Sequence, residues 1–170
     1  YRTNAQSRAF EEAFLRSAIP YKVVGGVRFY ERKEIKDFLG YLRLLINPND
    51  EVSLRRVINT PKRGIGDRAL DIVQEVATGN ATSMWHVLSL ANDQLPPRSS
   101  VAIAEFVALI KTLQTLVEAK SKPSDIAQAV LEQSGLLHEL QNSNDPQDES
   151  RIENLQELVA VATEYEEGEF

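Results

Sequence analysis

Apolar residues recur at three- and four-residue intervals along most of the 170-residue chain, the spacing of helices that pack by one face. Ile35, Phe38, Leu42 and Leu45 follow this spacing, and Asn47-Pro48 ends their segment. The pattern therefore predicts a mainly α fold. The expected helices cover about 4–17, 31–46, 51–58, 67–77, 83–91, 99–119, 124–133 and 152–164, with Gly135 after the seventh and a polar loop over 142–149.

The first 24 residues differ from the rest of the chain. A helix capped by Asn4 precedes Tyr21–Val24, a short β-rich run that Gly25 and Gly26 close. Residues 1–24 are therefore predicted to form a short α/β stub before a helical body over 25–170. Because the chain starts with Tyr1 rather than Met, we expect it to be a piece of a longer protein.

The composition excludes several kinds of chemistry. Hydrophobic residues make up 42% and charged residues 26%, as in ordinary soluble domains. Without cysteine, and with only two histidines, the chain offers no disulfide, thiol nucleophile or iron–sulfur ligand set. It has no uninterrupted apolar run of membrane-spanning length and no Gly-x-x-x-x-Gly-Lys-Ser/Thr loop for a nucleotide. We expect a soluble intracellular protein that needs no cofactor of its own.

Charge is unevenly distributed. Residues 1–68 hold 14 of the 19 lysines and arginines and only 8 of the 25 acids, so the remaining residues are strongly acidic. Such asymmetry indicates nucleic-acid contact by the basic part. Two differently solvated surfaces would explain it equally well.

The segment Arg55–Arg68 concentrates the candidate chemistry. It holds five basic residues against one acid, and Gly64-Ile65-Gly66 comes directly before an expected helix. Glycines let a backbone approach a phosphate closely, and a helix N-terminus offers unpaired N–H donors. Ile65 is expected to anchor the turn to the core. The pattern predicts a helix–hairpin–helix clasp on a duplex backbone, and the alternative is a tight turn with a solvated basic face.

The helix expected over 31–46 carries a second candidate feature. Three of its basic residues, Arg32, Lys36 and Arg43, share one side and form either a second row of phosphate contacts or a stripe kept for solubility.

Four blocks in this order resemble the UvrD/PcrA/Rep group of superfamily 1A DNA helicases. They start at Tyr1-Arg2-Thr3-Asn4, Val24-Gly25-Gly26, Asn59-Thr60-Pro61-Lys62-Arg63-Gly64 and Arg151-Ile152-Glu153-Asn154. The resemblance implies that residues 1–24 end a segment of subdomain 2A and that 25–170 form the helical 2B subdomain. The parent helicase would move 3′ to 5′ with ATP and Mg²⁺, and this piece alone would be inactive.

The resemblance also implies roles and partners. The partners would be duplex and single-strand DNA, subdomains 1A, 1B and 2A, and repair or replication proteins, in the bacterial cytoplasm at the nucleoid and with no membrane. The alternatives are a module that docks a protein through its acidic half, or a free-standing helix–hairpin–helix protein. The implied sites are the duplex contacts Lys36, Arg43, Lys62, Arg63, Gly64, Ile65, Gly66 and Arg68, the single-strand contacts Arg2, Asn4 and Arg28, and the conformational residues Gly25, Gly26, Asp50 and Glu51.

Overall fold

The computed structural model describes residues 31–90 and 97–167. The predicted α/β stub lies outside these residues, as do Arg2, Asn4, Arg28, Gly25 and Gly26, so the statements about them stay predictions. Within the described ranges the chain forms helices and no strands, which confirms the mainly α expectation. The helices are α3 (Lys33–Ile46), α4 (Glu51–Val57), α5 (Asp67–Gly79), α6 (Met84–Ser89), α7 (Pro97–Glu118), α8 (Pro123–Gln133), α9 (Leu136–Gln141) and α10 (Gln147–Glu167).

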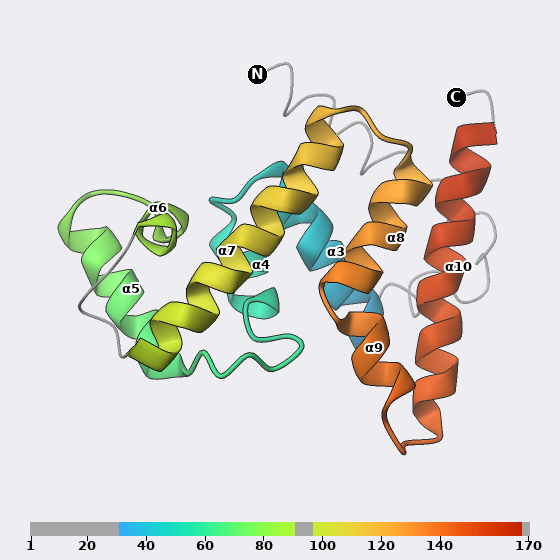
Figure 1. Ribbon diagram of the computed structural model, residues 1–170, viewed down its shortest axis with the longest axis horizontal. Coiled ribbons are helices and arrows are strands. Elements are labelled where there is room, and N and C mark those ends of the chain that lie inside the picture. Colours follow the sequence, from blue (N-terminus) through green and yellow to red (C-terminus); the bar gives the residue numbers. More distant parts are fainter. Residues whose placement is uncertain (1–30, 91–96, 168–170) are drawn as a thin grey trace.

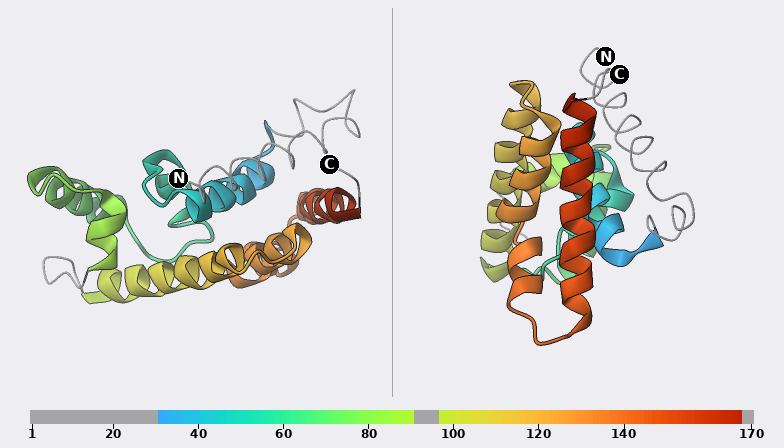
Figure 2. Two further views of the ribbon diagram at one scale, coloured as in Figure 1. Left: turned by 90° about the horizontal axis from the view of Figure 1, so that it is seen from above. Right: turned by 90° about the vertical axis from the view of Figure 1, so that its right-hand side faces the viewer.

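Helix α3 lies at the centre of the arrangement and packs against α4, α7, α8 and α10 (Figure 1). Seen from above, α3 and α4 form one row and α7 and α8 form another in front of it (Figure 2). Helices α5 and α6 pack together at one end, and α10 closes the other end against α8 and α9. The connection from α4 to α5 runs along the lower edge of Figure 1.

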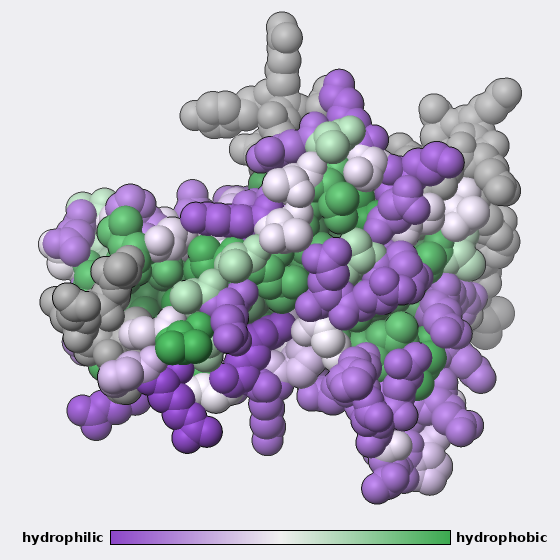
Figure 3. Space-filling view, viewed as in Figure 1, coloured by the Kyte–Doolittle hydropathy of each residue, from purple (hydrophilic) through white to green (hydrophobic). Residues whose placement is uncertain are grey.

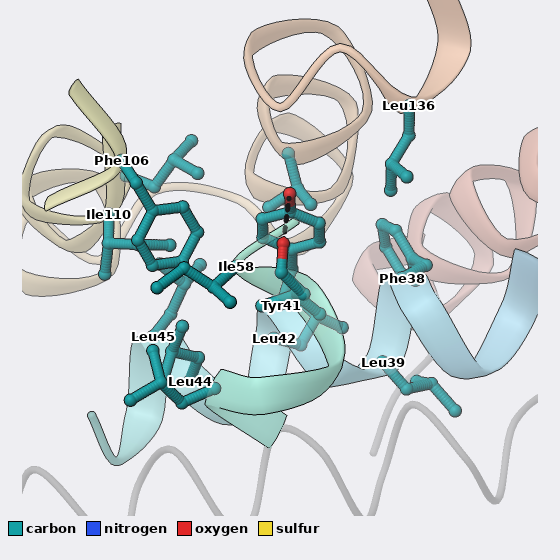
Figure 4. Packing of buried hydrophobic residues seen from close by; sticks show 14 of the residues in the cluster. Phe38, Leu39, Tyr41, Leu42, Leu44, Leu45, Ile58, Phe106, Ile110 and Leu136 are labelled. Atoms are coloured by element: carbon teal, nitrogen blue, oxygen red, sulfur yellow. Dashed lines mark hydrogen bonds between the residues drawn. The ribbon is translucent and has the colours of Figure 1, made fainter. Parts of the chain in front are cut away.

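The main core forms between the two rows because α3 is apolar on most of its circumference. Phe38, Tyr41 and Leu44 of α3 are fully buried. In Figure 4 Phe106 and Ile110 of α7 lie on the side of Leu44, and Leu136 of α9 lies beside Phe38. Burial of aromatic and branched side chains of this size supplies the main free energy of folding. The core thus holds the long helices in a fixed relation to the exposed α4–α5 connection.

The C-terminal third contains one helix that the pattern did not predict and one that begins early. Gly135 ends α8 in the left-handed conformation, with φ 87°, as the sequence predicts, but α9 starts at the next residue. Helix α10 begins at Gln147 rather than at residue 152. The side chain of Asp145 accepts the Gln147 amide at 2.9 Å and thereby starts the helix within the expected loop.

Asp148, in the first turn of α10, makes this helix start sensitive to acid. A hydrogen bond from Ser143 and a charge-assisted hydrogen bond from Arg151 lower the pKa of Asp148. A carboxylate with a lowered pKa stabilises the fold above its ordinary pKa, and this contribution is lost as the pH falls through the lowered value. We therefore expect Asp148→Asn to reduce the melting temperature at pH 7. The difference from the parent chain should shrink steadily between about pH 5 and pH 2. Thermal unfolding across this range measures it, and a difference that stays constant with pH would contradict the assignment.

Helix α7 changes one expectation from the sequence. Among the described residues it alone is long and apolar enough for a membrane span, with a mean hydropathy of 1.6 over its best stretch. A search for uninterrupted apolar runs misses it because Glu105 and Lys111 interrupt the segment. Ile103, Phe106 and Ile110 of α7 are buried in the same core as α3. We therefore interpret α7 as a helix of the folded core.

Candidate nucleic-acid interface

The α4–α5 connection places two glycines at the surface and the residue between them in the core. Gly64 and Gly66 are exposed, whereas Ile65 is only 1% exposed. Gly64 has φ 79°, which side chains other than glycine rarely adopt, and no atom lies within 4 Å of where its Cβ would stand. The predicted anchoring by Ile65 is confirmed, and the bend itself projects outward. In Figure 3 hydrophilic side chains project from the same lower edge of the molecule.

Asn59 holds the inner side of this bend. Its Oδ1 accepts the amide of Arg63 at 2.7 Å and the amide of Ile65 at 3.4 Å. Asparagine side chains commonly replace a backbone acceptor in this way in turns. With alternate amides bound inward, the amides of Gly64 and Gly66 have no acceptor among the described residues.

Helix α5 starts directly after the bend and adds further donors. Gly66 is its N-cap and provides no side-chain acceptor. The first hydrogen bond of the helix at this end runs from the Leu70 amide to the Gly66 carbonyl, at 3.3 Å. The amides of Asp67, Arg68 and Ala69 therefore lack acceptors within the described part of the chain. Together with the bend, they place a group of free N–H donors at the positive end of a 13-residue helix.

Two cations stand beside these donors. Lys62 and Arg68 are both exposed, and neither pairs with an acid among the described residues. On α3, Lys36 and Arg43 are also exposed, and they lie seven residues apart on one side of the helix. Gly40 lies between them, and its missing Cβ lets Val57 of α4 pack against α3 there. The two α3 cations therefore flank the point where α4 crosses α3.

Arg63 departs from its predicted role. Its guanidinium points into the molecule and donates hydrogen bonds to several backbone carbonyls and to the Tyr41 hydroxyl, at 2.6 Å for the latter. Both terminal nitrogens of the guanidinium thus bind acceptors inside the molecule. This geometry does not favour the phosphate contact predicted for Arg63.

Asp50 has a local structural role that the sequence analysis did not assign. It is the N-cap of α4, and its Oδ1 and Oδ2 accept from the amide and hydroxyl of Ser53 at 3.1 and 2.8 Å. Glu51 follows in the first turn of α4 and is half-buried. The conformational role that the resemblance implies for this pair stays a prediction.

A cavity of about 380 Å³ lies between α3, α9 and α10. Its buried acids are already paired, since Glu34 accepts from Asn154 at 3.0 Å and Asp37 pairs with Lys33 and Arg56. No cluster of histidine and acidic residues among those described is arranged to hold a metal ion. We therefore take the donors and cations of the α4–α5 connection as the candidate site.

Sequence reasoning missed Asn59 and Tyr41, the residues that shape the bend. The position of Asn59 before Thr60-Pro61 and four residues before Arg63 was a usable signal, because asparagine favours turns. Tyr41 gave no such signal, since its partner Arg63 lies 22 residues away in the chain.

A comparison with known families identifies the class of protein to which the chain belongs. The family described as UvrD-like helicase C-terminal domain matches residues 1–169, so the chain belongs to that family.

Proteins similar to this chain carry the names of helicases of the same family. The ATP-dependent DNA helicase UvrD1 of Mycobacterium tuberculosis (strain ATCC 25618 / H37Rv) is 48% identical over 97% of this chain. DNA helicase II of Haemophilus influenzae is 44% identical over 97%, and the ATP-dependent DNA helicase PcrA of Staphylococcus aureus (strain Mu50) is 41% identical over 99%. The chain is thus a helicase C-terminal domain of the UvrD/PcrA type, which confirms the resemblance. It spans 22–23% of the length of these relatives.

Proposed function

We propose that this chain is the duplex-engaging, regulatory 2B part of an ATP-dependent DNA helicase that moves 3′ to 5′. One observation carries the proposal: the Gly64–Gly66 bend and the first turn of α5 present amides without acceptors at the surface, beside Lys62 and Arg68. Backbone amides at a helix N-terminus are a natural site for a phosphate group. Contacts of this kind fix a protein on the duplex without reading its sequence.

The proposed mechanism is binding without chemistry. Amides of the bend hold one phosphate at short range, while Lys62, Arg68, Lys36 and Arg43 attract the duplex electrostatically. The duplex is thereby held near the fork while the motor of the parent protein pulls on one strand. Because the chain lacks a Gly-x-x-x-x-Gly-Lys-Ser/Thr loop, ATP and Mg²⁺ would bind elsewhere in the parent helicase, and the isolated chain would not hydrolyse ATP.

The names of the relatives support this larger setting. The mycobacterial and staphylococcal relatives are named ATP-dependent DNA helicases, and our chain matches about a fifth of their length. We propose that subdomains 1A, 1B and 2A surround it in the parent. In that setting Arg2, Asn4 and Arg28 would contact single-stranded DNA, and Gly25-Gly26 would act as a hinge. Asp50 and Glu51 would then influence the orientation of the subdomain.

The decisive measurement is duplex binding as a function of salt. Fluorescence anisotropy with a labelled blunt duplex should show weak binding whose affinity falls steeply as salt rises. Salt-insensitive association, or no association at low salt, would contradict the proposal. Either result would favour the alternative, a protein-docking module that uses the acidic half.

Lys62→Ala combined with Arg68→Ala tests the two cations directly. Each phosphate contact contributes about 0.9 to the slope of log affinity against log salt, so the double variant should lower the slope by nearly 2. Its affinity should fall for all duplex sequences alike. The matched control is Lys120→Ala combined with Lys122→Ala, which removes two exposed cations from the α7–α8 connection at the upper edge of Figure 1. An equal change in the control slope would mean that net charge, and not this site, controls binding.

A further inference from the structure

The side chain of Arg63 runs inward from the bend and binds main-chain carbonyls. Its Nη1 donates to the carbonyl oxygens of Val57, Ile58, Thr60 and Pro61 at 2.9, 3.1, 3.2 and 3.3 Å. These carbonyls belong to the end of α4 and to the segment that follows it. One guanidinium thereby fixes the path of the backbone from α4 into the bend.

The other terminal nitrogen ties the bend to more distant parts of the fold. Nη2 donates to the Tyr41 hydroxyl of α3 at 2.6 Å and to the Ser134 carbonyl at 3.1 Å. Ser134 is the C-cap of α8, and Pro61 also packs near Gly135, with a distance of 3.4 Å from its Cγ to the position of an added Cβ. The bend is therefore held against α3 and the α8–α9 corner together.

The surroundings of Arg63 favour a cation inside the molecule. The carbonyls of Val57 and Ser134 belong to the C-terminal ends of α4 and α8, where helix dipoles place partial negative charge. The guanidinium carbon lies 5.1 Å from the ring centre of Phe106 and 5.9 Å from that of Tyr41. Carbonyl dipoles and the faces of two rings thus stabilise the positive charge of Arg63 within the molecule.

We propose that Arg63 is a positioning residue that holds the Gly64–Gly66 bend with its free amides facing outward and does not itself contact DNA. This inference rests on the proposed function, because the bend is taken as the duplex-binding element. Its physical basis is that the Arg63 side chain binds inward while the next residue, Gly64, turns outward with φ 79°. Without the guanidinium, the carbonyls of Ile58, Pro61 and Ser134 lose this donor, and the link from the bend to the end of α8 is lost. The Tyr41 hydroxyl, which also donates to the Thr60 carbonyl, then provides the one remaining hydrogen bond from α3 to this segment among the described residues.

Arg63→Lys separates positioning from phosphate contact. Lysine keeps the charge, but three donors on a flexible stem cannot reach carbonyls of three segments as the planar guanidinium does. In the 170-residue chain we expect Arg63→Lys and Arg63→Gln to weaken duplex binding about equally, by about tenfold. The slope of log affinity against log salt should stay that of the parent chain for both variants. A direct contact predicts the opposite: lysine would retain most of the affinity, and glutamine would lower the slope by about 0.9. That result would overturn the inference.

A control distinguishes positioning from general loss of stability. Leu158→Ala removes a fully buried side chain of α10 and leaves the bend untouched. At a temperature where circular dichroism shows both variants folded, Leu158→Ala should bind the duplex like the parent chain. Weakening as large as in Arg63→Lys would overturn the proposal. Should Arg63→Lys fail to fold, Tyr41→Phe is the milder variant, because it removes the hydroxyl that accepts from Nη2 and that itself donates to the carbonyls of Val57 and Thr60. A smaller loss of affinity at constant slope is then expected, and unchanged affinity would count against the inference.

Amide spectra without DNA keep this inference separate from the proposed function. The resonances of Gly64 and Gly66 should shift in Arg63→Lys and stay in place in Leu158→Ala. If the parent chain fails to bind duplex while these shifts occur, the proposed function fails and the structural role of Arg63 stands. If the glycine resonances do not move in Arg63→Lys, the positioning role itself is wrong.

Discussion

Replacing Gly66 with alanine is expected to weaken duplex binding by about tenfold or more, with a loss of stability of at most about 1 kcal/mol because alanine is a poorer N-cap than glycine. Gly66 has φ −78° and ψ 167°, which alanine adopts freely, and no atom lies within 4 Å of the added Cβ. The methyl group therefore occupies open space beside the free amides, where a phosphate would approach. Anisotropy titrations with duplex DNA, together with thermal unfolding, measure both quantities.

The same helix offers a control at its other end. Gly79 is the last residue of α5, is exposed, and has no atom within 4 Å of an added Cβ. Gly79→Ala should therefore leave duplex affinity unchanged. Gly66→Asp extends the comparison, because an aspartate N-cap would satisfy the α5 amides and place a negative charge at the site. It should keep or slightly raise stability yet abolish binding, and undiminished binding by Gly66→Asp would exclude the bend as the phosphate site.

Gly40→Ala is expected to produce the second large effect, a fall in the free energy of unfolding of about 1–3 kcal/mol. The added Cβ would stand 2.8 Å from Cγ1 of Val57, a fully buried side chain with little freedom to move. Alanine ordinarily stabilises a helix interior by about 1 kcal/mol relative to glycine, so a net loss means that the clash between α3 and α4 dominates.

Chemical denaturation of Gly40→Ala beside Gly79→Ala tests this prediction. The two variants make the same substitution within helices, but only the first meets a neighbouring side chain. Gly40→Ala as stable as the parent chain would show that α4 can shift away from α3 at no cost. In that case the α4–α5 connection would not be fixed by the crossing at Gly40.

Local pattern predicted the helices well where they are long. Helices α3, α5, α7 and α8 repeat their apolar spacing over several turns, and their bounds lie within a few residues of the expected ones. Helix α9 has only six residues, which is too short for a period to appear. The start of α10 depends on one side chain, Asp145, within a segment whose polarity indicates a loop.

The candidate site also has features that the local sequence predicts and one feature that it does not. The outward glycines, the anchoring Ile65 and the exposed Lys62 and Arg68 all follow from residues next to one another in the sequence. The orientation of Arg63 does not, because two of its partners, Tyr41 and Ser134, are 22 and 71 residues away. In a one-dimensional pattern a basic residue beside two others is read as part of the same charged surface.

The amino-acid sequence by itself determined the helical class, the outward bend before α5 and the separation of basic from acidic parts, because each depends on spacing or composition within a few turns of chain. Three properties were visible only in the folded molecule: the inward orientation of Arg63, the amides that stay without acceptors, and the close approach of α4 to α3 at Gly40. These properties depend on the packing of α3, α7 and α8 around the α4–α5 connection. That packing brings carbonyls and rings from distant segments to one guanidinium, and leaves the neighbouring amides open.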